Sequence, residues 1–277
     1  MNKGIKIIDA HCHLHKPQWS PINLTDSKDI ITSRLHETFD EHLILSNMKE
    51  EPIEKTIIFP LPSIYIDLEK ANHYTVAISR KFPDQLIPFT IIDNKPDYWI
   101  ENGVKGFKEH TYGLRIQKDD TGNDCFSQKF KETYAFMEHH HIPLLLHAGT
   151  NRIERLKTDI FKDTPNLIVI LAHLGADFPE NNHHRPIRDQ VTRTLRELAE
   201  FPNLYFDISA ISEPELIRAG LEIAGSQKLI FGSDFPYDKP VNVLRTLETL
   251  NDLSPTDKEN ILYTNISNIL KRQDHTP

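Results

Sequence analysis

Eight short apolar runs, spread along the whole 277-residue chain, set the strongest limit on its fold. Each run is a few residues long and rich in Ile, Leu, Val and Phe, which is typical of strands buried on both faces. The eight runs are Ile5–Asp9, Thr56–Phe59, Leu86–Ile91, Val104–His110, Pro143–His147, Leu167–Ala172, Leu204–Ile208 and Leu229–Gly232.

Helical patterns separate these runs, which predicts parallel strands with helices on the outside. The helical stretches are Leu68–Phe82, Phe126–His140, Arg188–Glu200, Glu213–Ala224, Val241–Leu250 and Asp257–Leu270. An open doubly wound sheet is the competing fold, but no Gly-rich phosphate loop follows any run. We therefore predict an α/β fold of the (β/α)₈ TIM-barrel type, as a single domain over residues 1–277, because such barrels typically need about 250 residues.

The amino-acid composition argues against two classes of binding partner, nucleic acids and membranes. Lys plus Arg is 32 and Asp plus Glu is 40, giving a formal charge of −8, and no dense basic block interrupts this balance. An acidic chain repels phosphate backbones, so we expect no nucleic-acid partner. No apolar run approaches the ~18 residues of a membrane span, and the N-terminus lacks the pattern of a signal peptide. We expect a soluble cytoplasmic protein with no membrane partner.

The longest irregular stretch follows the first strand and covers residues 15–35. In a barrel this stretch lies over the carboxyl ends of the strands. Loops of this length in compact domains are often active-site lids, so we predict an active-site loop, with an ordinary surface insertion as the alternative.

Histidines and one aspartate stand where several strands end. His11 and His13 follow the first run and share a face because residues two apart in a strand point the same way, while Cys12 points away and is expected to pack. His147 ends the fifth run, and His173 and Asp234 follow the sixth and eighth runs. Barrel enzymes place their chemistry at these carboxyl ends, and imidazoles there suit a divalent metal.

Four segments resemble the signature segments of the amidohydrolase superfamily. They read Asp-Ala-His-Cys-His-Leu from residue 9, Leu-Leu-His-Ala-Gly from 145, Leu-Ala-His-Leu-Gly from 171 and Gly-Ser-Asp-Phe-Pro from 232. The nearest branch is the amidohydrolase-2 group of aminocarboxymuconate-semialdehyde decarboxylase-like metal-dependent hydrolases. The resemblance extends to residues 260–266, which are similar to the closing helix of that family.

The resemblance implies a role for each of these residues. His11, His13, His147 and Asp234 would be the metal ligands. Asp234 would also act as the catalytic general base, and His173 would either bind a second metal or polarise the substrate. A divalent ion lowers the pKa of its water from 15.7 to about 7, and a nearby carboxylate can take the released proton.

The segment from Gly103 to His110, which includes the fourth run, resembles the family's Gly-x-Lys-Gly-x-Lys-x-His segment. Strand alternation places Lys108 and His110 on the face toward the site and Phe107 on the outer face. Lys108 would be either a carbamylated bridge between two metals or a plain cation for a substrate carboxylate. We favour one metal, and we assign Lys108 and His110 to substrate binding.

Loop residues beyond the strand ends complete the predicted substrate site. Tyr112 and Arg115 follow the fourth run, and His184 and Arg185 lie in the stretch after the sixth. These side chains could orient an acidic or carbonyl substrate. The three histidines His139, His140 and His141 end a helix, where cations are favoured, so we interpret them as capping residues.

The leading functional hypothesis is a metal-dependent hydrolase that uses activated water on a small ester, lactone or amide. The alternative on the same site is non-oxidative decarboxylation of an unsaturated or aromatic acid. A barrel that binds a small molecule without turnover is the alternative of another class. Zn²⁺ suits the histidine-rich ligand set, Mn²⁺ would fit it too, and one or two ions are compatible with it. A homodimeric state is also compatible with the sequence, since members of the family that it resembles are often dimers.

Overall fold

Parallel strand pairing runs through the described part of the chain. The computed structural model describes residues 4–20, 34–63, 65–110, 130–149, 152–176 and 188–275. Its strands are β1 (Ile7–Leu14), β2 (Ile53–Pro60), β3 (Leu86–Pro88), β4 (Thr90–Ile91), β5 (Phe107–His110), β6 (Leu144–His147), β7 (Val169–Leu171), β8 (Leu204–Asp207) and β9 (Leu229–Ile230). They form two sheets, β1-β2-β3 and β4-β5-β6-β7-β8-β9, with each strand parallel to its neighbours.

Backbone hydrogen bonds join the two sheets at both edges. The predicted run Leu86–Ile91 is interrupted at Phe89, so that β3 pairs with β2 and β4 pairs with β5. The amide of Phe89 donates to the carbonyl of Ile58 in β2 at 2.9 Å. At the other edge, the amide of Ala10 donates to the carbonyl of Phe231, just after β9, at 3.0 Å. The strands therefore follow one another in sequence order around a (β/α)₈ barrel.

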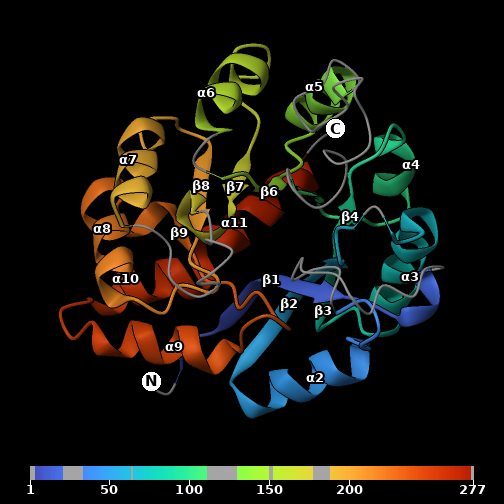
Figure 1. Ribbon diagram of the computed structural model, residues 1–277, viewed down its shortest axis with the longest axis horizontal. Helices are drawn as coiled ribbons and strands as arrows, with labels where there is room; N and C mark the ends of the chain where they lie inside the picture. The colour runs from blue at the N-terminus through green and yellow to red at the C-terminus, as the bar shows by residue number, and fades with distance from the viewer. Residues whose placement is uncertain are drawn as a thin grey trace.

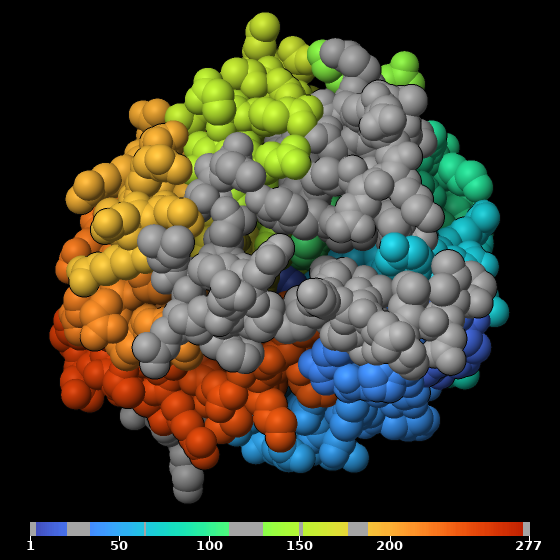
Figure 2. All heavy atoms as spheres, viewed as in Figure 1, coloured from blue at the N-terminus to red at the C-terminus, as the bar shows by residue number. Residues whose placement is uncertain are grey.

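Helices surround the strands. They are α2 (Glu41–Glu50), α3 (Leu68–Lys81), α4 (Pro96–Glu101), α5 (Lys131–His139), α6 (Ile153–Arg155), α7 (Arg188–Leu198), α8 (Pro214–Ala224), α9 (Pro240–Thr249), α10 (Pro255–Glu259) and α11 (Asn265–Lys271). Most of them lie around the rim of the molecule, with the strands inside (Figure 1). The space-filling view from the same side shows blue α2 beside orange-red α9 at the lower edge, so the two ends of the barrel sequence meet (Figure 2).

Local chemistry explains where helix α3 begins and ends. The carboxylate of Asp67 accepts a hydrogen bond from the amide of Lys70 at 3.1 Å and caps the first turn. Pro83 disfavours helical backbone at Phe82, and α3 ends at Lys81. Helices α2, α4 and α6 were not predicted from the sequence. The described part of the predicted Phe126–His140 helix is α5, and residues 126–129 lie outside the described residues.

Two apolar layers hold the barrel together. The outer layer lies between strands and helices and includes Phe107 and Cys12, as the alternation predicted. The inner layer fills the barrel and comprises Ile8, Ala10, Ile57, Phe59, Phe89, Leu145, Ile168, Ile170, Ile230, Ile266 and Ile269. The last two come from α11, so the closing helix contributes to the barrel interior. Each fully buried aliphatic side chain contributes about 1.5–3 kcal/mol.

Among the described residues, none of the helices has the length and apolar character that crossing a bilayer requires. The predicted active-site loop over residues 15–35 is described only at its two ends, since residues 21–33 lie outside the described residues.

Candidate metal centre

The carboxyl ends of six strands bring polar side chains together. β1 carries His11 and His13, β5 ends with Lys108 and His110, and β6 ends with His147. His173 follows β7 directly, Asp207 ends β8 with Ser209 two residues later, and Asp234 follows β9. The aromatic ring of Phe59, near the end of β2, packs against His11 and His13 with ring centroids 5.2 and 4.9 Å apart.

A β-bulge in β1 turns the two histidines into the barrel. Ile8 and Ala10 belong to the inner apolar layer, whereas Cys12 and Leu14 belong to the outer layer. The register shifts between Asp9 and Cys12, where β1 has one more residue than β2. A bulge reverses the side-chain alternation, and bulges recur next to active sites for this reason. His11 therefore faces the interior although it shares its parity with outward-facing Ile7.

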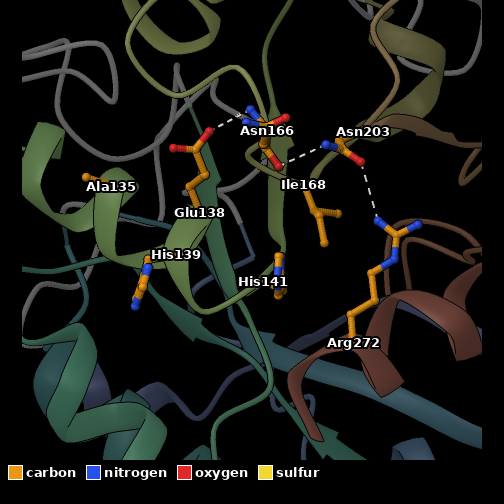
Figure 3. A pocket seen from close by; sticks show the side chains of 8 residues that line it. All are labelled: Ala135, Glu138, His139, His141, Asn166, Ile168, Asn203 and Arg272. Carbon is orange, nitrogen blue, oxygen red and sulfur yellow. Dashed lines mark hydrogen bonds between the residues drawn. The ribbon is translucent and has the colours of Figure 1, made fainter. Parts of the chain in front are cut away.

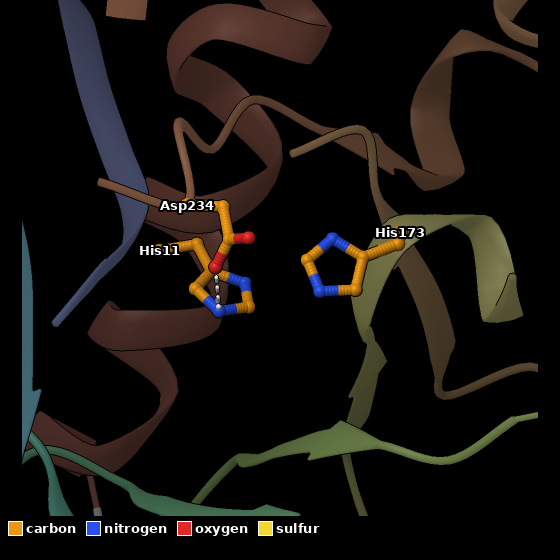
Figure 4. Close-up of side chains that lie close together, drawn as sticks. All are labelled: His11, His173 and Asp234. Carbon is orange, nitrogen blue, oxygen red and sulfur yellow. Dashed lines mark ion pairs between the residues drawn. The ribbon is translucent and has the colours of Figure 1, made fainter. Parts of the chain in front are cut away.

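Three side chains from three strands form a group with metal-ligand geometry. The donor atoms of His11, His173 and Asp234 lie within 4.8 Å of one another, and all three residues are buried. His11 Nε2 is 3.2 Å from Asp234 Oδ1, and the ring of His173 faces this pair from the opposite side (Figure 4). His13 Nε2 is 3.0 Å from the same oxygen. Two or three imidazole nitrogens and one carboxylate oxygen are donors that Zn²⁺ accepts.

His147 lies beside this group. Its ring stacks on that of His110 with centroids 4.1 Å apart and contacts the ring of His173 at 4.8 Å. Among the described residues, the group that meets the ligand geometry contains His173 and not His147. The assignment of His147 as a ligand and of His173 as a catalytic residue stays a prediction.

Burial keeps four imidazoles of this cluster neutral. Desolvation lowers the pKa of His11 to about 3, and the nearby charge of Lys108 acts in the same direction. Burial also holds the pKa values of His13, His110 and His147 well below the ordinary value. A neutral imidazole has a free lone pair, which metal binding requires.

Lys108 is buried completely within this cluster. Its ammonium group lies 5.2 Å from the centroid of the Phe59 ring, and its Nζ has no hydrogen-bond partner in the described structure. Burial lowers the pKa of Lys108 to about 8, against the opposing charges of Asp207 and Asp234. A buried amine without a hydrogen bond is energetically costly.

The backbone at the strand ends is also unusual. His173 and Asp234 have φ angles of 55° and 68°, in the left-handed region that residues other than glycine rarely occupy. Such conformations cost about 1–3 kcal/mol each and persist at functional sites where the surroundings hold them. The positions of these two side chains therefore come at the expense of folding stability.

Sequence reasoning missed Asp207, Ser209, Asp9 and Ser233. Asp207 Oδ2 lies within hydrogen-bond distance of Nδ1 of His11, at 2.8 Å. Asp9 accepts hydrogen bonds from the Ser233 amide at 2.8 Å and from its hydroxyl at 2.6 Å, which ties β1 to the segment bearing Asp234. The rule that located Asp234, a polar residue at a strand's carboxyl end, also applies to Asp207 and would have identified it.

Four predicted substrate-binding residues lie outside the described residues. They are Tyr112, Arg115, His184 and Arg185. Their assignment to substrate binding stays a prediction.

A groove of about 870 Å³ lies away from this cluster. It is lined by Ala135, Glu138, His139, His141, Asn166, Ile168, Asn203 and Arg272 (Figure 3). His141, Ile168 and Asn203 precede β6, β7 and β8, so the groove is at the amino ends of the strands. Barrel chemistry occurs at the opposite end, and we therefore place the functional site at the imidazole cluster despite the groove's size.

The comparisons with known proteins agree with this geometry. Residues 8–272 match the amidohydrolase family, and the chain belongs to that family. The match confirms the family predicted from the sequence, and the parallel strands that are joined at both edges confirm the barrel.

One curated relative and two solved structures illustrate the range of chemistry. The 6-methylsalicylic acid decarboxylase of Penicillium expansum is 32% identical over 104 residues, which cover 35% of this chain and 32% of that protein. The match thus spans about a third of the relative's length. The 2,6-dihydroxybenzoate decarboxylase from Rhizobium superposes with a TM-score of 0.69 and 16% identity, covering 96% of this chain and 99% of that one. A zinc-bound amidohydrolase from Burkholderia multivorans superposes with a TM-score of 0.73 and 14% identity, and it covers the same shares of the two chains.

Proposed function

We propose that this protein is a metal-dependent enzyme that removes CO₂ from a small aromatic or unsaturated carboxylic acid without oxidation. Hydrolysis was the leading expectation from the sequence, and decarboxylation was its alternative. Two considerations favour decarboxylation over hydrolysis. The similar proteins include two decarboxylases of hydroxylated aromatic acids, and the site carries a buried cation suited to a carboxylate.

The observation that carries the proposal is the position of Lys108. Its ammonium group is fully buried, lacks a hydrogen-bond partner in the described structure and lies beside the ring of Phe59. A planar acid could place its carboxylate at the ammonium group and its ring against Phe59. A charged hydrogen bond of this kind is worth about 1.5–3 kcal/mol.

The residues that fit a metal are His11, His13, His173 and Asp234, with His147 predicted as a further ligand. A divalent ion bound there would supply Lewis-acid stabilisation of negative charge on the substrate. Zn²⁺ is our proposal for the ion, on the nitrogen-rich ligand set.

Asp234 is the group we assign to proton transfer, because its carboxyl oxygen faces both strand-one imidazoles. It delivers a proton to the ring carbon that bears the carboxylate. The bond between that carbon and the carboxylate then breaks, its electron pair stays with the ring, and CO₂ leaves. Overall, one carboxylate and one proton give one arene and one CO₂, and solvent restores the proton on Asp234.

The family membership of the chain also keeps hydrolysis as a second candidate. In that reaction Asp234 would take a proton from water and return it to the leaving group. Lys108 would still hold an anionic part of the substrate. The two reactions differ in their products, so one screen separates them.

The test combines a substrate screen with metal control. Chelated, zinc-loaded and manganese-loaded protein are incubated with 2-hydroxybenzoates, including 6-methylsalicylate and 2,6-dihydroxybenzoate, and with lactones, esters and amides. Decarboxylation predicts release of CO₂ that disappears on chelation. Ring opening or ester cleavage without CO₂ would support hydrolysis instead. No turnover with metal fully bound would contradict both and favour a binding barrel.

Lys108→Met separates substrate binding from a metal bridge. We expect kcat/KM to fall by about 10- to 150-fold, the equivalent of one charged hydrogen bond, with unchanged metal stoichiometry. A fall from two ions to one would instead indicate that Lys108 is a carbamylated bridge. Lys105→Met is the matched control, since Lys105 precedes β5 and lies away from the carboxyl end.

A further inference from the structure

We propose that Asp207 and Ser209 act together as positioning residues that fix the tautomer of both His11 and His173, so that each imidazole presents Nε2 to the metal-ligand group. The proposal rests on the metal-dependent function argued above. It assigns a specific role to two residues that we place neither among the metal ligands nor among the substrate-binding residues.

One carboxylate serves both histidines. Asp207 Oδ2 lies 2.8 Å from His11 Nδ1. Asp207 Oδ1 accepts hydrogen bonds from the backbone amides of His173 at 2.8 Å and Ser209 at 3.1 Å, and it also contacts the Ser209 hydroxyl. Asp207 and Ser209 are both completely buried. The side chain thus connects β1, β8 and the segment after β7.

Donors surround the carboxyl group of Asp207. Its Oδ1 accepts hydrogen bonds from two backbone amides and from the Ser209 hydroxyl, and hydrogen bonds of this kind favour the carboxylate form. An ionised carboxylate only accepts hydrogen bonds. Its contacts with Nδ1 of His11 and with the hydroxyl of Ser209 therefore require a proton on each of those partners.

The number of available protons determines the tautomer of the second imidazole, that of His173. The single hydroxyl proton of Ser209 is directed to Asp207, so Ser209 Oγ can only accept from other groups. His173 Nδ1 lies 2.9 Å from this oxygen and 2.9 Å from the Ser209 carbonyl oxygen, which also only accepts. His11 Nδ1 lies 3.1 Å from the same hydroxyl oxygen. Both histidines therefore carry their proton on Nδ1.

The consequence is that each ring, in its neutral form, has its lone pair on Nε2. For His11 this atom is 3.2 Å from Asp234 Oδ1, on the side where the three ligand residues meet. Partners that bond the second nitrogen of a ligand histidine set its tautomer and orientation, and their loss commonly weakens metal binding by about 10- to 100-fold. Asp207 does this for one histidine directly and holds the left-handed backbone of the other.

The direct test is the tautomeric state of the metal-free protein. Long-range ¹H–¹⁵N NMR of imidazole nitrogens, with His11 and His173 assigned by single substitutions, should show both rings with the proton on Nδ1. A proton on Nε2 of either ring in wild-type protein would overturn the proposal. This measurement needs no substrate, so the tautomers can be as proposed even if the protein turns out not to decarboxylate any acid.

Two substitutions compare the contributions of Asp207 and Ser209 to the histidine tautomers and to zinc affinity. Asp207→Asn replaces an acceptor oxygen with a donor amide, and we expect a mixed or reversed tautomer at His11 and about 10- to 100-fold weaker zinc binding in a chelator competition. Ser209→Ala keeps the Asp207–His11 contact and the carbonyl acceptor of His173, so both tautomers should persist with a smaller loss of affinity. Asp257→Asn, at a helix cap distant from the site, controls for the chemical change. Unchanged tautomers and zinc affinity in a folded Asp207→Asn protein would contradict the proposal.

Discussion

Gly232→Ala should disturb the metal centre without altering any ligand. Gly232 follows β9, and a Cβ atom added there would lie 2.8 Å from Cβ of His11, 3.2 Å from Cβ of Ser209 and 3.4 Å from the backbone nitrogen of His11. Non-bonded carbon atoms pack best at about 3.5–4.0 Å. These Cβ atoms are fixed to the backbone, so neither side chain can rotate away.

The geometry sets the size of the effect. The contact with His11 must open by roughly 0.7–1.2 Å to reach the normal carbon separation. Overpacking of this kind costs about 1–3 kcal/mol of folding stability. Ligand distances in metal sites tolerate only about 0.2 Å, so a shift of His11 should also weaken zinc binding by at least about tenfold.

The assay has two parts. Urea denaturation of chelated protein measures the loss of stability, and zinc competition against a chromophoric chelator measures affinity. Gly220→Ala in α8 is the matched control, because its new Cβ would meet the end of the Leu229 side chain at 3.2 Å rather than a fixed atom. We expect no change in zinc affinity there. Wild-type stability and affinity in Gly232→Ala would refute the close packing of β9 against His11.

Two further predictions concern the rate and the pH dependence of stability. Asp234→Asn should keep the fold and lose at least ~10²-fold in turnover of whichever substrate the screen identifies, the scale of general acid–base help; a rate close to wild type would exclude Asp234 from proton transfer. For chelated protein, stability should fall as the pH drops below about 6.5, because unfolded histidines bind protons there while buried His11, with its pKa lowered to about 3, does not. Each such imidazole adds a slope of up to about 1.4 kcal/mol per pH unit, and Asp9, whose pKa burial raises to about 7, offsets one of them. Urea midpoints at pH 7 and 5.5 measure the slope, and midpoints that rise on acidification would show that His11 is not buried in its neutral form.

Strand positions were predictable because the interior strands are apolar on both faces. Every predicted run overlaps at least one strand of the barrel, and the run that is interrupted at Phe89 changes partner there from β2 to β5. The polar residues that end these runs also meet as expected. His11 and Asp234, which are 223 positions apart in the sequence, lie 3.2 Å apart in the fold.

Local geometry at the strand ends was beyond the sequence pattern. Simple alternation gives His11 and His13 a common face but does not say which face, and the bulge after Asp9 decides it. The left-handed backbone of His173 is likewise held by a tertiary contact with Asp207, which no local signal near residue 173 records.

The central claim is that residues from separate strands hold one divalent cation at the carboxyl end of the barrel. Anomalous diffraction at the zinc edge, from crystals of chelated protein soaked in zinc, tests it directly. We predict a strong peak bounded by His11, His173 and Asp234, which disappears in His11→Ala. A peak confined to surface histidines, or none at saturating zinc, would contradict the claim.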